Sequence, residues 1–174
     1  MLNPGRIAAV RAAVEYDRVA RRLVLRAKFG GRTEILRHLG EHLARVAVHS
    51  GIGESCSLVT VVPSHPWVRV IRGFNPALEV ARPVARALRI PLRPGVLSRR
   101  FRSMVPAKRL SAAERRRTLR KAFRCRRTLS GERVLLIDDV VTTGATAESC
   151  AAVLLGAGAE SVHLAVWART PLRR

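Results

Sequence analysis

Hydrophobic residues recur every three to four positions in two stretches near the amino end of the chain, over residues 16–29 and 33–48. This spacing predicts two amphipathic helices. A glycine pair follows the first stretch, and Thr33 is a candidate N-cap for the second helix. We therefore expect residues 1–50 to form a helical amino-terminal part.

Farther along the chain, the apolar residues form short, β-branched runs instead of helical stripes. Such runs predict buried strands. Asn75-Pro76 is a typical helix start, so the apolar positions of 77–88 predict a helix, and those of 145–155 predict another. Strands that alternate with helices imply an α/β fold with a mainly parallel sheet flanked by helices, whose binding sites lie beyond the carboxyl ends of the strands. The predicted strands are 58–62, 134–137 and 162–167.

Residues 93–127 interrupt this alternation with many arginines and a single acidic residue, Glu114. We interpret this segment as a mobile basic excursion that contains one short helix near 111–121. The core of the fold is then 57–169. A chain of 174 residues has the size of one well-packed domain. Because it shows neither an internal repeat nor a linker, we expect residues 1–174 to be a single domain.

The chain carries 33 Lys and Arg residues against 12 Asp and Glu residues, which gives a formal net charge of +21. An excess of this size points to a polyanionic partner: a nucleic acid, a phosphorylated metabolite or a membrane surface. Only three of the basic residues are lysines, and GC-rich coding also favours arginine. The charge alone therefore does not choose among these partners.

The apolar runs are too short for a membrane span, which needs roughly 18–20 residues. The first residues of the chain also lack the apolar core of a signal peptide. The three cysteines are scattered, which argues against a zinc ribbon or a disulfide framework. We expect a cytoplasmic protein.

The string VLLIDDVVTTGAT at 134–146 combines acidic, hydroxyl and glycine residues in an informative order. A predicted buried strand ends in Asp138 and Asp139, and a threonine-rich turn then leads into a helix. Free backbone N–H groups and the positive end of the helix dipole attract an anion there, hydroxyls can donate hydrogen bonds, and a glycine lets the backbone approach closely. This order predicts a phosphate segment made of Thr142, Thr143, Gly144, Ala145 and Thr146.

Two carboxylates next to a phosphate would repel it, so the acidic pair, Asp138 and Asp139, must bind another part of the ligand. The vicinal hydroxyls of a ribose fit, because a carboxylate only accepts hydrogen bonds and hydroxyls donate them. A Mg²⁺ ion shared with the ligand would reduce the repulsion further. The string therefore predicts a site for ribose 5-phosphate, best satisfied by phosphoribosyl pyrophosphate, rather than a simple strand end and helix cap.

The same string resembles the phosphoribosyl pyrophosphate loop of type I phosphoribosyltransferases. Residues 16–169 as a whole resemble the ComF branch of that superfamily, which is associated with competence for DNA uptake. The residues RGFN at 72–75 are similar to a signature of that branch, and LSAAER at 110–115 with AF at 122–123 is similar to a later stretch. The resemblance implies the type I phosphoribosyltransferase fold.

By this resemblance, Asp138 and Asp139 would be the catalytic acids that bind the ribose hydroxyls, and the phosphate segment would hold the 5-phosphate. Pyrophosphate would bind at a loop, 63–69, through backbone amides and often a non-proline cis peptide. Mg²⁺ would bridge pyrophosphate and ribose, with the acidic pair as its candidate protein ligands. The basic excursion would close over the site while pyrophosphate is displaced at the anomeric carbon. The implied pyrophosphate contacts are Pro63, Ser64, His65, Arg69 and Arg72.

Four departures from the ComF pattern concern other parts of the chain. The amino-terminal cysteine-rich zinc module common in that branch has no counterpart in this sequence, and the glutamine that usually follows RGFN is Pro76. A glutamine and an asparagine of the basic stretch are replaced near Ala107 and around Thr118-Leu119.

Two hypotheses therefore stay open, each compatible with a homodimer. One is a Mg²⁺-dependent phosphoribosyltransferase with an unknown nitrogenous acceptor; the other is a non-catalytic competence protein that binds single-stranded DNA or senses phosphoribosyl pyrophosphate.

Overall fold

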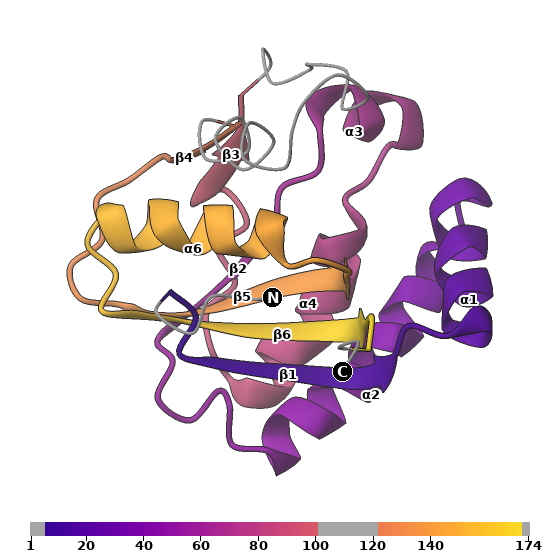
Figure 1. The fold of residues 1–174 in the computed structure, drawn as a ribbon, viewed down its shortest axis with the longest axis horizontal. Coiled ribbons are helices and arrows are strands. Elements are labelled where there is room, and N and C mark those ends of the chain that lie inside the picture. The colour runs from indigo at the N-terminus through magenta and orange to yellow at the C-terminus, as the bar shows by residue number, and fades with distance from the viewer. Residues whose placement is uncertain (1–5, 101–121, 172–174) are drawn as a thin grey trace.

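A computed structural model describes residues 6–100 and 122–171 of the chain (Figure 1). Its central strands are β1 (Ala9–Glu15), β2 (Leu58–Val61), β5 (Arg133–Val141) and β6 (Ser161–Arg169). They form one parallel sheet in the order β1-β6-β5-β2. The predicted α/β class and the three predicted strands are confirmed.

The described helices are α1 (Arg18–Phe29), α2 (Thr33–His49), α3 (Pro66–Arg72), α4 (Pro76–Leu88) and α6 (Ala145–Gly156). They cover both faces of the sheet, with α6 in front and α4 behind it in Figure 1. Side chains alternate along a strand, so Leu135 of β5 packs in the core with α1, α2 and α4, while Leu136 packs with α6. Both faces of β5 are thus buried, which explains its continuous apolar run. Among these described helices, none has the length and apolar character needed to cross a membrane.

The strand β1 is not predicted by the sequence pattern. Its residues are rich in alanine and include Arg11, so they fit neither a strong helical stripe nor a strong strand. They form the edge of the sheet because they pair with β6, for example Ala12 with Val166. The amino-terminal part is therefore a strand followed by two helices rather than helical throughout, and its partner strand lies near the other end of the chain.

Two helix starts test the predicted caps, and a third, that of α1, has a cap that the sequence pattern does not predict. Asp17 caps α1, since its carboxylate accepts a hydrogen bond from the N–H of Ala20 at 2.7 Å. The cap predicted for α2 is wrong, because Thr33 is already helical and the preceding Arg32 makes no side-chain cap. The cap predicted at Asn75 is confirmed at the start of α4.

The two ends of the basic segment form structure that its composition does not predict. They are β3 (Leu97–Arg99) and β4 (Phe123–Cys125), which pair as a two-stranded antiparallel ribbon outside the main sheet. Leu97 and Phe123 are buried in the core on the α6 side. These apolar side chains anchor the ribbon although arginines surround them in the sequence. The rest of the segment, including the helix predicted near 111–121, lies outside the described residues.

Candidate functional site

The carboxyl ends of β2 and β5 bring the two predicted binding segments to one edge of the sheet. The two strands are neighbours, with Val61 paired to Ile137, and the N–H of Val62 donates a hydrogen bond to the carbonyl of Ile137 at 2.9 Å. The loop after β2 therefore starts beside the acidic pair that follows Ile137. This edge is where parallel α/β sheets bind their ligands.

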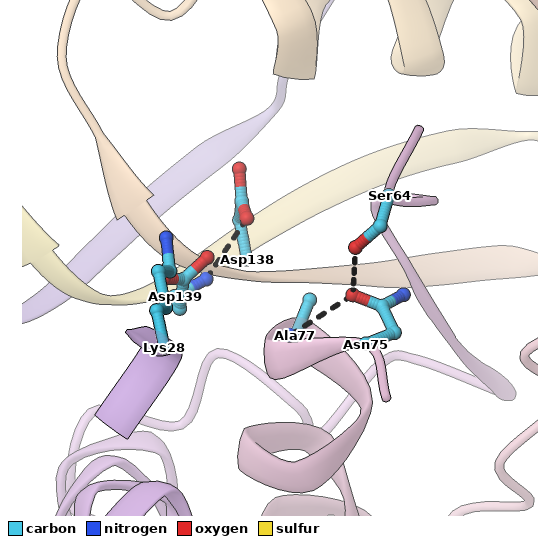
Figure 2. A network of polar contacts seen from close by, with 6 residues as sticks. All are labelled: Lys28, Ser64, Asn75, Ala77, Asp138 and Asp139. Carbon is cyan, nitrogen blue, oxygen red and sulfur yellow. Dashed lines mark hydrogen bonds and ion pairs between the residues drawn. The ribbon is translucent and has the colours of Figure 1, made fainter. Parts of the chain in front are cut away.

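The two carboxylates of the acidic pair point in different directions (Figure 2). They belong to consecutive residues of β5, and consecutive strand residues face opposite sides of a sheet. Asp139 is 6% exposed and forms an ion pair with Lys28 of α1. Asp138 is half-buried, and its Oδ1 accepts a hydrogen bond from the N–H of Asp139 at 2.9 Å. The two acids thus have different partners, and Lys28 is a site residue that the sequence does not single out.

The charge of Asp138 is only partly compensated by the protein. Burial raises the pKa of its carboxyl group well above the ordinary value, and the neighbouring Asp139 carboxylate raises that pKa further. The positive charge of Lys28 acts in the opposite direction. A ligand that brings hydroxyl donors or a cation to Asp138 would favour its ionised form. This carboxylate is therefore suited to a ribose hydroxyl or to a cation.

The phosphate segment joins β5 to the start of α6. Gly144 directly precedes the helix with a φ of 82°, a left-handed conformation that favours glycine. Thr142 and Thr143 are exposed, and Thr143 Oγ1 accepts a hydrogen bond from the N–H of Ala145 at 3.4 Å. Thr146 is half-buried in the first turn. Because first-turn N–H groups have no partner within their helix, the start of α6 offers donors next to exposed hydroxyls, which is what a phosphate needs.

On the other side of this edge, Asn75 ties the loop after β2 to the start of α4 (Figure 2). Its Oδ1 accepts hydrogen bonds from the hydroxyl of Ser64 at 2.7 Å and from the N–H of Ala77 at 3.2 Å. Its Nδ2 donates to the carbonyl of Val62 at 3.2 Å. Pro76 fits as the next residue because the first position of a helix needs no N–H donor. The asparagine of the RGFN stretch is therefore a structural link as well as a helix cap.

The predicted pyrophosphate loop, 63–69, is shorter in the structure. α3 begins at Pro66, so only residues 63–65 form a loop, which we call the β2 loop. The expectation of a cis peptide is wrong for the described residues, whose peptide bonds are all trans. His65 Nδ1 accepts a hydrogen bond from the N–H of Trp67 at 3.3 Å. Burial, followed by the charge of Arg99, lowers the pKa of His65 and favours the neutral form of its ring.

The two arginines implied as pyrophosphate contacts both belong to α3. The guanidinium of Arg72, at the end of the helix, lies over the ring of Phe29 at 5.1 Å from its centre. The backbone of Arg69 is helical, and its side chain lies outside what the structure describes. The structure thus places Arg72 next to α1 and leaves the role of Arg69 a prediction.

A cavity of about 830 Å³ opens beside the β2 loop, between the start of α4 and the β3–β4 ribbon. Ser64 and Asn75 contribute to its lining, and Arg99 and Arg126 bring positive charge to it. Arg99 is half-buried, and its guanidinium lies 5.5 Å from the centre of the Phe123 ring. Nothing in the sequence distinguishes Arg99 from the other arginines of the basic segment, because its position depends on the ribbon.

Comparisons with known proteins show which family this chain resembles. Residues 75–174 match the family model of the phosphoribosyl transferase domain, so the match includes the acidic pair and the phosphate segment. The DNA utilization protein YhgH of Escherichia coli O157:H7 is 33% identical over 151 residues, which cover 85% of this chain and 66% of that protein. Competence protein F of Haemophilus influenzae is 31% identical over 109 residues, which cover 61% of this chain and 46% of that protein. These two names confirm the resemblance to the ComF branch.

The chain spans slightly less than two thirds of the length of the YhgH protein. Among solved structures, the purine phosphoribosyltransferase of Pyrococcus horikoshii Ot3 aligns with a TM-score of 0.46 and 15% sequence identity. That alignment covers 76% of this chain and 83% of the other.

Proposed function

Because the chain belongs to the phosphoribosyl transferase domain family, we propose that it binds phosphoribosyl pyrophosphate and transfers the phosphoribosyl group to a nitrogenous acceptor. The observation that carries this proposal is the edge of the sheet at which the acidic pair, the phosphate segment and the β2 loop meet. A ribose with phosphate groups at both ends needs carboxylates that accept hydrogen bonds from its hydroxyls and N–H groups that donate hydrogen bonds to its 5-phosphate. It also needs a second loop for the pyrophosphate.

In this proposal each part of the edge holds one part of the ligand. The phosphate segment binds the 5-phosphate through the first-turn N–H groups of α6 and the threonine hydroxyls. Asp138 accepts a hydrogen bond from a ribose hydroxyl, and Asp139 accepts another while Lys28 holds it. The C–O bond to pyrophosphate breaks as the acceptor nitrogen bonds to the anomeric carbon, and the acceptor loses a proton to water. The protein orients the two reactants and stabilises the positive charge that develops on the ribose ring.

Mg²⁺ fits the donor chemistry of this edge. It is a hard cation that prefers oxygen ligands, and Asp138 provides a carboxylate whose charge is only partly compensated. Within residues 6–100 and 122–171, no group of three His, Cys, Asp or Glu side chains could hold a metal ion. We therefore propose that the ligand supplies most of the oxygens and the acidic pair supplies the rest. A bound Mg²⁺ ion would neutralise part of the charge of the departing pyrophosphate.

Titration calorimetry with phosphoribosyl pyrophosphate and Mg²⁺ tests the binding site. We expect Asp138→Asn with Asp139→Asn to abolish measurable binding. The matched control is Glu54→Gln with Glu160→Gln, because these exposed acids precede β2 and β6 at the opposite edge of the sheet. Wild-type affinity in the aspartate variant would refute the site.

An assay of pyrophosphate release tests the transfer reaction. The wild-type protein is incubated with phosphoribosyl pyrophosphate, Mg²⁺ and a panel of nitrogenous bases and amines. Release that depends on one acceptor, and that is lost in the aspartate variant, supports a transferase. Tight binding without release for every acceptor would favour a protein that senses the ligand.

We also propose a second candidate function, the binding of single-stranded DNA. It is motivated by α1, which exposes four arginines and contains no acidic residue. Three of them lie four residues apart, so they share one stripe of the helix. The relatives are named for DNA utilization and competence, and this function is consistent with those names. The exposed arginines are Arg18, Arg21, Arg22 and Arg26.

Fluorescence anisotropy with a labelled oligothymidine tests this second function. We expect Arg18→Gln, Arg22→Gln and Arg26→Gln together to weaken binding about tenfold or more at 0.1 M salt and to flatten its salt dependence, because fewer counterions are released. The variant Asp138→Asn with Asp139→Asn serves as the control and should bind DNA like the wild type. Negligible wild-type binding at that salt concentration would remove this candidate.

A further inference from the structure

Two consecutive residues in the last turn of α1 contact the end of β5 and the end of α3. Lys28 forms the ion pair with Asp139 at the end of β5, and Phe29 lies under the guanidinium of Arg72 at the end of α3. In Figure 1 the strands β5 and β6 point toward the side of the molecule where α1 lies. α1 therefore belongs to the site although it precedes the family match, which starts at residue 75.

We propose that Lys28 is a positioning residue of the phosphoribosyl site, which holds the Asp139 carboxylate in place and neutralises it so that a phosphorylated ribose can approach. The inference rests on the proposed function, because it concerns the same ligand. It adds a residue outside the motif and gives α1 a role in ligand binding.

The burial of the ion pair supports this role. The side chain of Lys28 is 22% exposed and that of Asp139 is 9% exposed, so water screens the pair only in part. Removing one partner of such a pair leaves a buried charge without compensation. Without Lys28, two adjacent carboxylates would face a ligand that carries several negative charges. With Lys28, the local negative charge is reduced by one, and the Asp139 carboxylate lies beside the ammonium group (Figure 2).

The type of residue at position 28 fits the same interpretation. Lys28 is the one lysine within residues 6–100 and 122–171, and all other basic side chains of the Lys and Arg type in these ranges are arginines. An ammonium group is a compact charge on a flexible stem, whereas a guanidinium is a larger planar fork. A compact charge on a flexible stem can reach the Asp139 carboxylate from the last turn of α1.

The ring of Phe29 contacts the guanidinium of Arg72 and so connects this helix end with α3. Phe29 is 76% exposed, so the contact with Arg72 lies at the surface. Arg72 directly precedes the turn that leads to Asn75, which in turn holds Ser64. The chain of contacts from Asp139 through α1 to the β2 loop therefore passes through two adjacent residues of one helix.

Calorimetry on single and double variants tests the inference, with phosphoribosyl pyrophosphate and inorganic phosphate as separate probes. We expect Lys28→Met to weaken the binding of both probes about tenfold, and Lys28→Arg to restore affinity to within about threefold of the wild type. Arg45→Met removes one positive charge from an exposed position of α2, and it should change both affinities less than about twofold.

A double-mutant cycle shows whether Lys28 acts through Asp139. Asp139→Asn removes the charge that Lys28 compensates, so Lys28→Met should change phosphate affinity less than about twofold in that background. Thermal denaturation of each variant shows whether it is folded, and the double variant, which lacks both charges, keeps the test valid if Lys28→Met alone unfolds.

The outcomes separate this inference from the proposed function. If the wild type binds phosphate but not phosphoribosyl pyrophosphate, the proposed function fails, while the phosphate measurements still test Lys28. Unchanged affinities in Lys28→Met, an equal loss in Arg45→Met, or the same loss in the Asp139→Asn background would each overturn the role of Lys28. If the wild type binds neither probe, both proposals are overturned.

Discussion

The two halves of the candidate site are built in different ways. The half after β5 is continuous in the sequence, since the acidic pair, the phosphate segment and the helix start all lie within 134–146. The half after β2 is assembled from separate segments, because Ser64 is held by Asn75 and Arg99 comes from β3. A continuous half can be recognised from the order of its residues. An assembled half depends on contacts between segments, so changes there should affect folding as well as binding.

Gly144 offers the strongest test of the continuous half. We expect Gly144→Val to weaken phosphoribosyl pyrophosphate binding about 100-fold in calorimetry, because a β-branched residue at a φ of 82° strains the turn and moves the first N–H groups of α6. Gly156→Val is the matched control, since Gly156 ends the same helix, has no positive φ and has open space around it. Equal affinities in the two variants would mean that the turn geometry does not matter for the ligand.

Asn75 offers the corresponding test of the assembled half. We expect Asn75→Ala to lower the free energy of unfolding by about 2–4 kcal/mol, since three hydrogen bonds are lost and their partners are only partly exposed. Urea denaturation measures this change. Asn75→Asp keeps the two accepted hydrogen bonds and removes the donor to Val62, so its stability should lie between those of Asn75→Ala and the wild type. An Asn75→Ala variant as stable as the wild type would show that this half does not depend on the link.

The pH dependence of stability tests the raised pKa of the half-buried Asp138 carboxyl group. Because its pKa is raised in the folded protein above the ordinary value of 3.8, the folded state keeps a proton that the unfolded chain has lost as the pH rises above 3.8. The free energy of unfolding of the wild type should therefore fall as the pH rises from 3.8 to the raised pKa of Asp138. Asp138→Asn removes this loss, so we expect the variant to be more stable than the wild type at pH 7 in the absence of ligand.

Urea denaturation at several pH values checks this expectation, and the difference between Asp138→Asn and the wild type should vanish below pH 3.8. Glu160→Gln, which changes an exposed acid at the opposite edge of the sheet, is the control. A difference that stays constant with pH would argue against a raised pKa at Asp138.

Ser64 gives the smallest expected effect and sharpens the test of Asn75. Ser64→Ala removes one hydrogen bond, so we expect a loss of about 1 kcal/mol in the free energy of unfolding. In the Asn75→Ala background the same change should have almost no effect, because the partner is already absent. Additive losses in the double variant would show that Ser64 and Asn75 act independently.

Much of the fold follows from local patterns. The strands β2, β5 and β6 are visible in the sequence as short continuous apolar runs, and the helices α2 and α4 as stripes with helical period. Asn75-Pro76 marks a helix start by its own chemistry. The position of the site also follows, since parallel strands carry their ligands at the carboxyl ends.

The missed elements share a physical cause. β1 is alanine-rich and becomes a strand through its pairing with β6, and the β3–β4 ribbon depends on Leu97 and Phe123 reaching the core. α3 replaces part of the predicted loop, although Pro66 could have been interpreted as the first residue of a helix. For β1 and the ribbon the deciding contact therefore lies outside the local segment, whereas α3 has a local signal.

The sequence by itself determined the ligand class that we propose, because the acidic pair and the phosphate segment are adjacent residues whose chemistry is independent of distant contacts. Only the tertiary structure decided how that pair is used. It turned Asp139 toward Lys28, left Asp138 partly compensated and placed Arg99 near the β2 loop. The physical reason is that a charge is set by its neighbours in space, and these neighbours come from α1 and β3, far from 134–146 in the sequence.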